Sequence, residues 1–105
     1  MTDTRLILVT ASPRAEAKRI AHSLVEEHLA ACVNLISGVH SVYRWNEAVE
    51  TAEEVLLLIK TRQEKVDAVR TRVHELHSYE LPEFLVLDVA DGSAAYLEWI
   101  AASVR

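Results

Sequence analysis

The chain has 105 residues, half of them apolar, and its two glycines and two prolines interrupt it little, so we predict one compact domain over residues 1–105. Its formal net charge is −5, with acidic and basic residues interspersed, which argues against nucleic acid as a partner. No apolar run approaches the roughly 20 residues of a membrane span and Cys32 is the only cysteine, so we expect a cytoplasmic protein with neither a membrane partner nor an intrachain disulfide.

The first part of the chain predicts a strand followed by a helix. The short apolar run Leu6–Val9, partly β-branched, is typical of a strand. It stops at Ser12 and Pro13, where serine can cap a helix and proline can occupy its first turn. Within residues 13–29 apolar side chains recur at helical spacing, so we expect this helix to cover the sheet with one face.

A long hairpin is predicted in the middle of the chain. Residues 31–45 form one strand, in which we expect a bulge at Gly38. A tight turn at residues 46–48 leads to a second strand over residues 49–61, whose inner half is apolar on both faces.

The length of this hairpin predicts contacts between subunits. Each strand has about 13 to 15 residues, whereas a helix of about 16 residues is about 24 Å long and spans only about seven strand residues. Roughly half of the hairpin must therefore project past the helices. An exposed edge favours pairing with another chain, so we expect an interface at Val42, Tyr43 and Trp45. Tyr43 and Trp45 also suit base stacking, which the negative charge disfavours.

The rest of the chain completes the fold prediction. Residues 61–64 match a capping box, with Thr61 at the cap and Glu64 three residues later, and open a helix that ends near Leu76. Residues 84–89 predict a strand, and residues 96–100 belong to a short final helix. The order βαββαβ plus a C-terminal helix indicates an α+β fold of the split βαβ, or ferredoxin-like, class: one antiparallel sheet with two helices on one face and a long hairpin.

The stretch HELHSYELPE at residues 74–83 is rich in polar side chains. On a helical wheel His74 faces solvent and His77 lies at the border of the buried face. The two rings are one turn apart and could share a metal ion, although a histidine in a last turn also interacts favourably with the helix dipole. The next residues could line a cleft between subunits or simply start the last strand: Tyr79, Glu80 and Glu83.

Four segments together resemble the divalent-cation-tolerance (CutA) family. They are HLAACVNLISGVHSVYRW at 28–45, VLLLIKTRQEKV at 55–66, LHSYELPEFLVLDV at 76–89 and YLEWI at 96–100. The resemblance runs through nearly the whole chain without large gaps. It implies a ferredoxin-like subunit in a homotrimer whose hairpins pack on neighbouring subunits, and a role in tolerance to copper and other divalent metal ions.

The resemblance also bears on metal ligands. Some members have a cysteine at the end of the first strand and a His-His pair before the tyrosine, a ligand set suited to copper. This chain has Val9 and Leu76-His77 at those positions, so only His77 remains of that set. Cys32, in the Ala-Ala-Cys motif, is a second candidate ligand, although a lone cysteine in an apolar strand is more often core. We expect no obligatory cofactor, with copper or another divalent metal as the candidate ion.

Three functions remain open. No phosphate-binding loop, nucleophile elbow or HExxH motif appears, so we do not expect an enzyme. The leading hypothesis is a cytoplasmic homotrimer that responds to divalent metal ions and binds copper. One alternative, by analogy of fold with nitrogen-regulatory PII proteins, is a sensor that binds a small molecule in clefts between subunits. The other is a structural or anchoring trimer.

Overall fold

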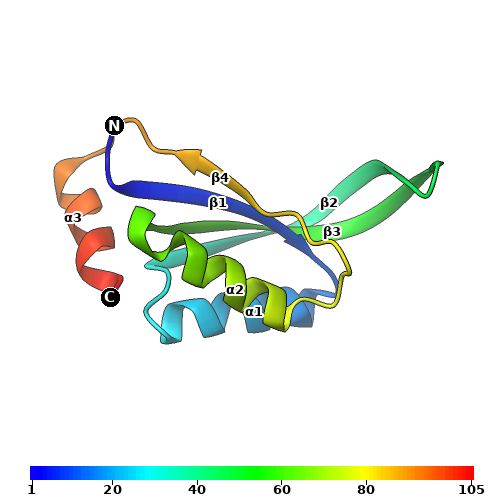
Figure 1. Cartoon of the computed structure of the whole chain (residues 1–105), viewed down its shortest axis with the longest axis horizontal. Helices are drawn as coiled ribbons and strands as arrows, with labels where there is room; N and C mark the ends of the chain where they lie inside the picture. The colour runs from blue at the N-terminus through cyan, green and yellow to red at the C-terminus, as the bar shows by residue number, and fades with distance from the viewer.

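A computed structural model describes all of residues 1–105. The order of elements is the predicted one, with a short 3₁₀ turn (η1) before the second helix (Figure 1). The bounds are β1 Thr4–Ala11, α1 Arg14–Glu26, β2 Cys32–Trp45, β3 Ala48–Arg62, η1 Gln63–Lys65, α2 Val66–Leu76, β4 Leu85–Asp88 and α3 Ala94–Ser103.

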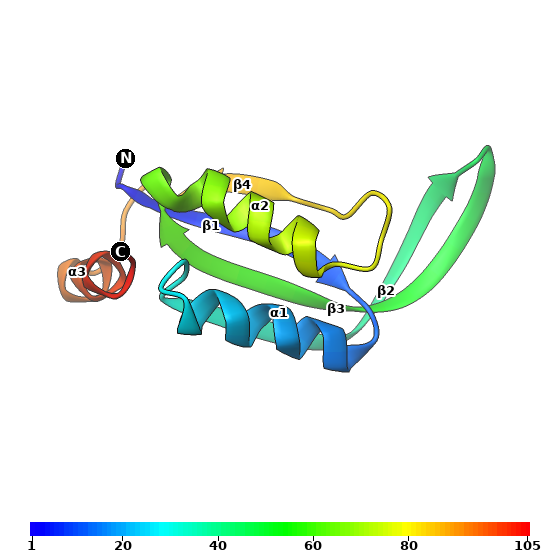
Figure 2. The ribbon, with the colours of Figure 1, turned by 60° about the horizontal axis from the view of Figure 1, so that its bottom comes forward.

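The four strands form one antiparallel sheet in the order β2-β3-β1-β4. Helices α1 and α2 lie side by side on one face of this sheet, and α3 lies beyond its end (Figure 2). This arrangement confirms the predicted ferredoxin-like fold. None of the helices has the length and apolar content that a membrane crossing requires.

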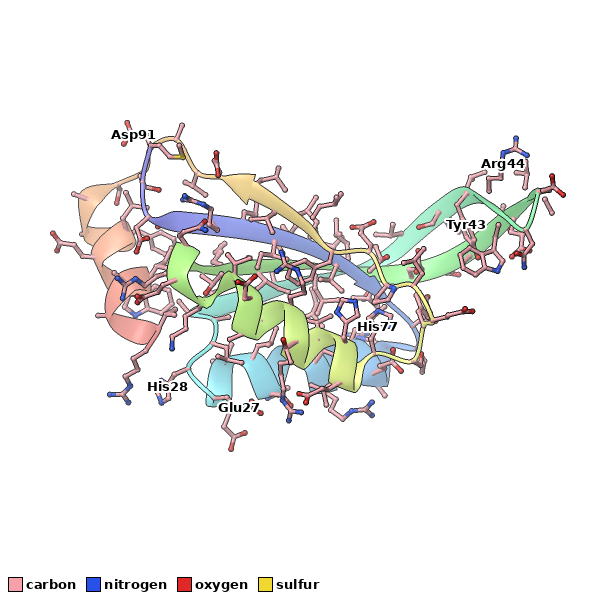
Figure 3. All side chains as sticks on the ribbon, in the orientation of Figure 1. Glu27, His28, Tyr43, Arg44, His77 and Asp91 are labelled. Carbon is pink, nitrogen blue, oxygen red and sulfur yellow. The ribbon has the colours of Figure 1, made fainter.

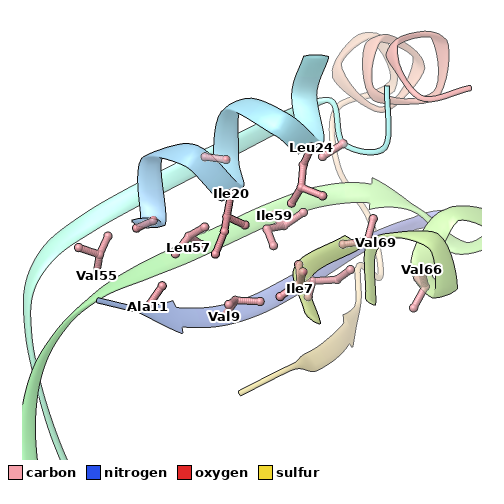
Figure 4. Close-up of a cluster of buried hydrophobic side chains, with 14 residues drawn as sticks. Ile7, Val9, Ala11, Ile20, Leu24, Val55, Leu57, Ile59, Val66 and Val69 are labelled. Atoms are coloured by element: carbon pink, nitrogen blue, oxygen red, sulfur yellow. The ribbon is translucent and has the colours of Figure 1, made fainter. Parts of the chain in front are cut away.

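The core fills the space between the sheet and the two helices (Figure 4). Alternate residues of the central strands face the helices: Ile7 pairs with Ile59 and Val9 with Leu57, and all four side chains are fully buried. Full burial of one such side chain stabilises a fold by about 1.5–3 kcal/mol. The helices contribute residues at helical spacing to the same core, namely Ala17, Ile20, Ala21, Leu24, Val66, Val69 and Val73.

The sheet face opposite the helices is also apolar, and α3 reaches it at one end, where Tyr96 contacts Lys60. The leucines of β4 on this face stay exposed. The register places Leu8 opposite Leu58 on one side and Leu85 on the other, so all three share this face. Leu85 is 56% exposed, and Ile36, which pairs with Leu56, is 46% exposed. We call this surface the open sheet face; its residues are Leu6, Leu8, Ile36, Leu56, Leu58, Leu85 and Leu87.

The hairpin of β2 and β3 projects past the helices, as predicted (Figure 1). The predicted bulge is confirmed, because the register shifts between Ile36 and Val39, and Gly38 has a φ of 75°. The chain reverses at Asn46 and Glu47, with φ values of 49° and 64°. Two consecutive positive φ angles are the signature of a type I′ turn, whose twist matches that of the strands.

The capping box predicted at Thr61 was wrong. β3 continues through Arg62, and no side chain caps η1 or α2. Thr61 instead lies on the helix-facing side of β3, where it is fully buried and its hydroxyl donates to the carbonyl oxygen of Leu29 at 2.6 Å. The local sequence matched a capping box, but the Thr61 hydroxyl bonds to Leu29, which is distant in sequence, instead of to the start of a helix.

Other element ends also differ from the predictions. Ser12 does not cap α1, whose N-cap residue is Pro13. α1 ends at Glu26 rather than near residue 29, because the chain turns away with a left-handed φ of 62° at His28. The last strand is limited to Leu85–Asp88, which pair only with β1.

Candidate functional site

His77 is the first residue after α2 and points into the space between the helices and the sheet (Figure 3). It is 9% exposed. Its Nε2 lies 2.7 Å from the carbonyl oxygen of Thr10, which can only accept, so Nε2 carries the proton and donates. Nδ1 then accepts from the backbone N–H of Tyr79 at 3.1 Å. Both ring nitrogens are therefore engaged within the chain.

Glu16, in the first turn of α1, holds the same loop from the other side. Its carboxylate is nearly buried and accepts from the backbone N–H of Ser78 at 3.2 Å and from the Ser78 hydroxyl at 3.0 Å. It also lies 3.6 Å from Nδ1 of His77. Glu16 was not among the predicted site residues, although its spacing offered a signal: Glu16, Ile20 and Leu24 follow one another at four-residue steps on the buried stripe.

Tyr79 connects this loop to the base of the hairpin. Its hydroxyl donates to Oε2 of Glu54 at 2.7 Å, and its ring packs against that of His77 with centroids 4.5 Å apart. Burial raises the pKa of the Tyr79 hydroxyl, and the hydrogen bond to Glu54 raises it further. Tyr79 thus stays protonated as the donor to a buried carboxylate. No local pattern marked Glu54, because the pairing depends on residues 25 positions apart.

Glu83 completes the group of acidic side chains at this end of the sheet. Burial raises the pKa of the Glu83 carboxyl, and the charge of Glu54 raises it further. Glu80, by contrast, is exposed. We call the group the Tyr79 cluster; it consists of Glu16, Glu54, His77, Ser78, Tyr79 and Glu83. No buried side-chain nitrogen or oxygen in the chain lacks a hydrogen-bond partner, so the buried polar atoms of the cluster are all satisfied.

The two predicted metal ligands lie far apart in the chain. Cys32, half-buried, begins β2 opposite Lys60, whereas His77 bonds to Thr10, which lies opposite Leu56. Four residues along β3 separate these positions by about 13 Å. His77 and Cys32 of one chain therefore cannot bind the same ion. Nor does the chain bring any three His, Cys, Asp or Glu side chains together in an arrangement that could hold a metal ion.

The three residues predicted for a subunit interface all lie on the projecting hairpin. Val42 is 70% exposed, Tyr43 41% and Trp45 37%. Tyr43 and the neighbouring Arg44 stand well away from the helices (Figure 3). The hairpin thus presents large apolar side chains to its surroundings, and their place in an interface stays a prediction.

Sheet order and helix placement define the chain as an α+β protein of the ferredoxin-like class. A family model described as "CutA1 divalent ion tolerance protein" matches residues 5–103. The chain belongs to the CutA1 family.

Curated relatives agree with this assignment. The divalent-cation tolerance protein CutA of Thermus thermophilus is 42% identical over 90% of this chain and 92% of its own length. The chloroplastic protein CutA of Arabidopsis thaliana is 42% identical over 95% of this chain. The chain spans only 55% of the Arabidopsis protein, so the two proteins are comparable only over that part.

Solved structures share the whole fold. CutA from Xylella fastidiosa superimposes with a TM-score of 0.97 at 41% identity, covering 99% of this chain and 100% of that one. A periplasmic divalent cation tolerance protein CutA from Archaeoglobus fulgidus gives 0.94 at 37% identity, with 97% and 99% coverage. A PII-like protein CutA from Nostoc gives 0.90 at 37% identity, with 96% and 97% coverage.

Proposed function

We propose that this chain acts as a homotrimer in the response to divalent metal ions, without enzymatic activity. The observation that carries the assembly is the open sheet face, whose leucines would otherwise remain in water. The proposed role in the response to divalent metal ions rests on the names of the relatives, which include "divalent-cation tolerance protein".

The sheet edges support a ring of subunits. One edge strand is β2 and the other is β4, so pairing an edge of one copy with the opposite edge of the next uses two different surfaces. Such head-to-tail contacts form a closed ring when the rotation between copies allows it. The number three comes from the family resemblance, and the projecting hairpins reach the neighbouring subunits.

We further propose that copper or another divalent ion binds weakly in a cleft between subunits. Since no three-ligand group exists within the chain, ligands must come from more than one copy. His77 would coordinate through Nδ1, because Nε2 donates to Thr10. Coordination then replaces the hydrogen bond from the Tyr79 N–H, an interaction that contributes about 1 kcal/mol, which weakens binding. Cys32 is the soft ligand of the proposal.

Calorimetric titration with Cu(II) and Zn(II), alongside the mass from light scattering, tests this proposal. We expect saturable binding with a Kd below about 100 μM. His77→Ala should weaken it about tenfold or more, as loss of a ligand does. His74→Ala is the matched control, since its ring is exposed and bonds only to the Arg70 carbonyl. Absence of saturable binding would remove direct metal binding from the proposal. Equal affinity in the two variants would remove His77 as a ligand.

The cytoplasm is the proposed compartment. The free thiol of Cys32 suits a reducing environment. Relatives differ in this respect, since one is named chloroplastic and another periplasmic. Fractionation of cells expressing the chain with its native flanking sequence tests the proposal, and a signal confined to another compartment contradicts it.

A second candidate function is a PII-like sensor of small molecules, which the description of the Nostoc relative as PII-like favours. The Tyr79 cluster joins the hairpin base to the loop after α2, so a ligand there would contact both. A thermal-shift screen with nucleotides and organic anions in the presence of EDTA separates the two functions. A compound that raises Tm supports the sensor, whereas stabilisation by metal ions alone, measured in a parallel screen without EDTA, supports the metal role.

A further inference from the structure

A second region of interest is a groove between α1 and β2, away from the Tyr79 cluster. Its volume is about 470 Å³, within the range typical of small-molecule sites. One wall is α1, with Arg14, Lys18 and His22, and the other is β2, with Asn34 and Ser37. We call it the α1–β2 groove. It uses none of the residues proposed for the metal site.

The groove is positively charged in a chain whose net charge is negative. Arg14, Lys18 and His22 follow one another at four-residue steps, so they share one face of the helix. No aspartate or glutamate lines the groove. Apolar side chains line it as well, among them Val25 and Val33. The lining therefore suits a ligand with anionic ends and an apolar body.

Arg14 and Lys18 differ from most cations of the chain, because neither has a hydrogen-bond or ion-pair partner. Four of the 11 lysines and arginines make no hydrogen bond or ion pair: Arg14, Lys18, Arg44 and Lys65. Arg44 lies on the hairpin and Lys65 in η1, so only Arg14 and Lys18 line the same hollow. A smaller hollow that Arg14 also lines includes Glu53 and Glu54, whose carboxylates disfavour an anion there.

We propose that the α1–β2 groove binds a small organic dianion, with carboxylate or phosphate groups at the two ends of a short apolar chain. The Arg14 guanidinium binds one anionic group in a two-pronged fashion, as arginine does with carboxylates and phosphates. Lys18 binds the other. Positions four residues apart are separated by about 6 Å along a helix, so the anionic groups have a similar spacing.

Titration of the ¹⁵N-labelled full chain with adipate tests the proposal by NMR. Adipate carries two carboxylates on a short apolar chain, hexanoate carries one on a chain of the same length, and 1,6-hexanediol carries none. We expect saturable shifts of amides in residues 14–25 and 33–37 with adipate. Hexanoate should bind about tenfold more weakly, the effect of losing one charge-assisted contact, and the diol should cause no shift.

Substitutions identify the cations that contribute. Arg14→Gln and Lys18→Gln should each weaken adipate binding about tenfold. Arg44→Gln and Lys65→Gln remove the same charge from other unpartnered positions and should leave the affinity unchanged. All four side chains belong to polar residues outside the core, so the folded amide spectrum should persist.

Three results overturn the proposal. If all four variants weaken adipate binding equally, the net charge of the protein explains the binding and the groove does not. Unsaturable shifts, or shifts confined to other residues, mean that the groove is no site. If adipate fails to bind and Arg14→Gln alone lowers the molecular mass in light scattering, a neighbouring subunit fills the groove instead.

Discussion

Three side chains hold the loop after α2 in place. His77 bonds to Thr10 of β1, Tyr79 to Glu54 of β3, and Glu16 of α1 accepts two hydrogen bonds from Ser78. The loop is thus attached to both central strands and to the neighbouring helix. Each bond involves a nearly buried group, for which loss of a partner costs more than the bond itself contributes.

Tyr79→Phe should lower the free energy of unfolding by about 1–3 kcal/mol, because Glu54 keeps its buried carboxylate and loses its donor. Urea denaturation at fixed protein concentration measures this. Tyr96→Phe is the control, since its exposed hydroxyl meets only Lys60 at 3.3 Å, and it should change stability by less than about 0.5 kcal/mol. Equal effects of the two variants would contradict the role given to Glu54.

Glu83→Gln should stabilise the protein near neutral pH. The pKa of Glu83 is higher in the folded state, so the folded protein binds this proton more tightly than the unfolded chain does. The free energy of unfolding therefore falls as pH rises from the ordinary glutamate value through the raised one. We expect a Tm gain of up to about 5 °C at neutral pH.

The gain from Glu83→Gln should vanish below pH about 4, where the glutamate is protonated in both states. Tm measured at the two pH values gives the comparison. Glu80→Gln is the matched control, because that side chain is exposed and should show no such difference. A gain that persists at low pH would exclude the charge of Glu83 as its cause.

Single residues differed in how far the sequence could predict them. His77 was placed at the edge of the buried face by helical periodicity alone, and it is buried. Glu16 was predictable in principle, because it lies on the apolar stripe of α1. The Tyr79–Glu54 bond was not, since a contact between residues distant in sequence depends on the assembled sheet.

At the scale of elements, long periodic segments were predictable and their ends were not. The bulge at Gly38 and the turn after Trp45 depend on the local backbone conformation, which the residue types at these positions indicate. The start of α2 depended on Thr61, whose hydroxyl bonds to Leu29 across the fold. A capping pattern cannot reveal that competition, because it considers only neighbouring residues.

Two substitutions in the hairpin, one in its turn and one at its bulge, should change the free energy of unfolding in opposite directions. Glu47→Gly should raise the free energy of unfolding by about 1 kcal/mol, because glycine adopts the positive φ of 64° without the steric cost that other residues incur. Gly38→Ala should lower it by about 1–2 kcal/mol for the same reason. No atom lies within 4 Å of the added Cβ, so the cost is conformational rather than steric crowding.

Chemical denaturation of these two variants and the parent provides the test. Glu50→Gly, in the adjoining strand, is the control and should destabilise, as glycine does in a strand interior. If Glu47→Gly also destabilised, the left-handed conformation at the turn would not be the source of the strain.

The whole molecule leaves four surfaces without a partner in the chain: most of the open sheet face, the two sheet edges and the projecting hairpin. The principal extents of 45 × 25 × 23 Å reflect the hairpin, which extends the long axis. The length of the hairpin in the sequence led to the prediction of partner subunits. The sequence gave no sign of which residues form the open face, because that requires the register between strands.

Substitution of the hairpin aromatics tests the proposed assembly. Val42→Ser with Trp45→Ser should weaken subunit association at least about tenfold, since buried tryptophans often contribute about 2 kcal/mol or more to an interface. Light scattering over a dilution series measures the change. Arg44→Ser, between the two positions, is the control. A trimer equally resistant to dilution in both variants would exclude the hairpin from the interface.

The position of β1 in the sheet has a consequence for how the chain folds. β1 precedes the other strands, yet it pairs with residues 55–62 of β3 and 85–88 of β4, so both of its partners come much later in the chain. The β2–β3 hairpin needs only local contacts and can form earlier. We expect pulse-labelled hydrogen exchange to protect amides of the hairpin before those of β1. During translation β1 therefore stays without a strand partner until the hairpin has been made, and its pairing on the other side waits for β4.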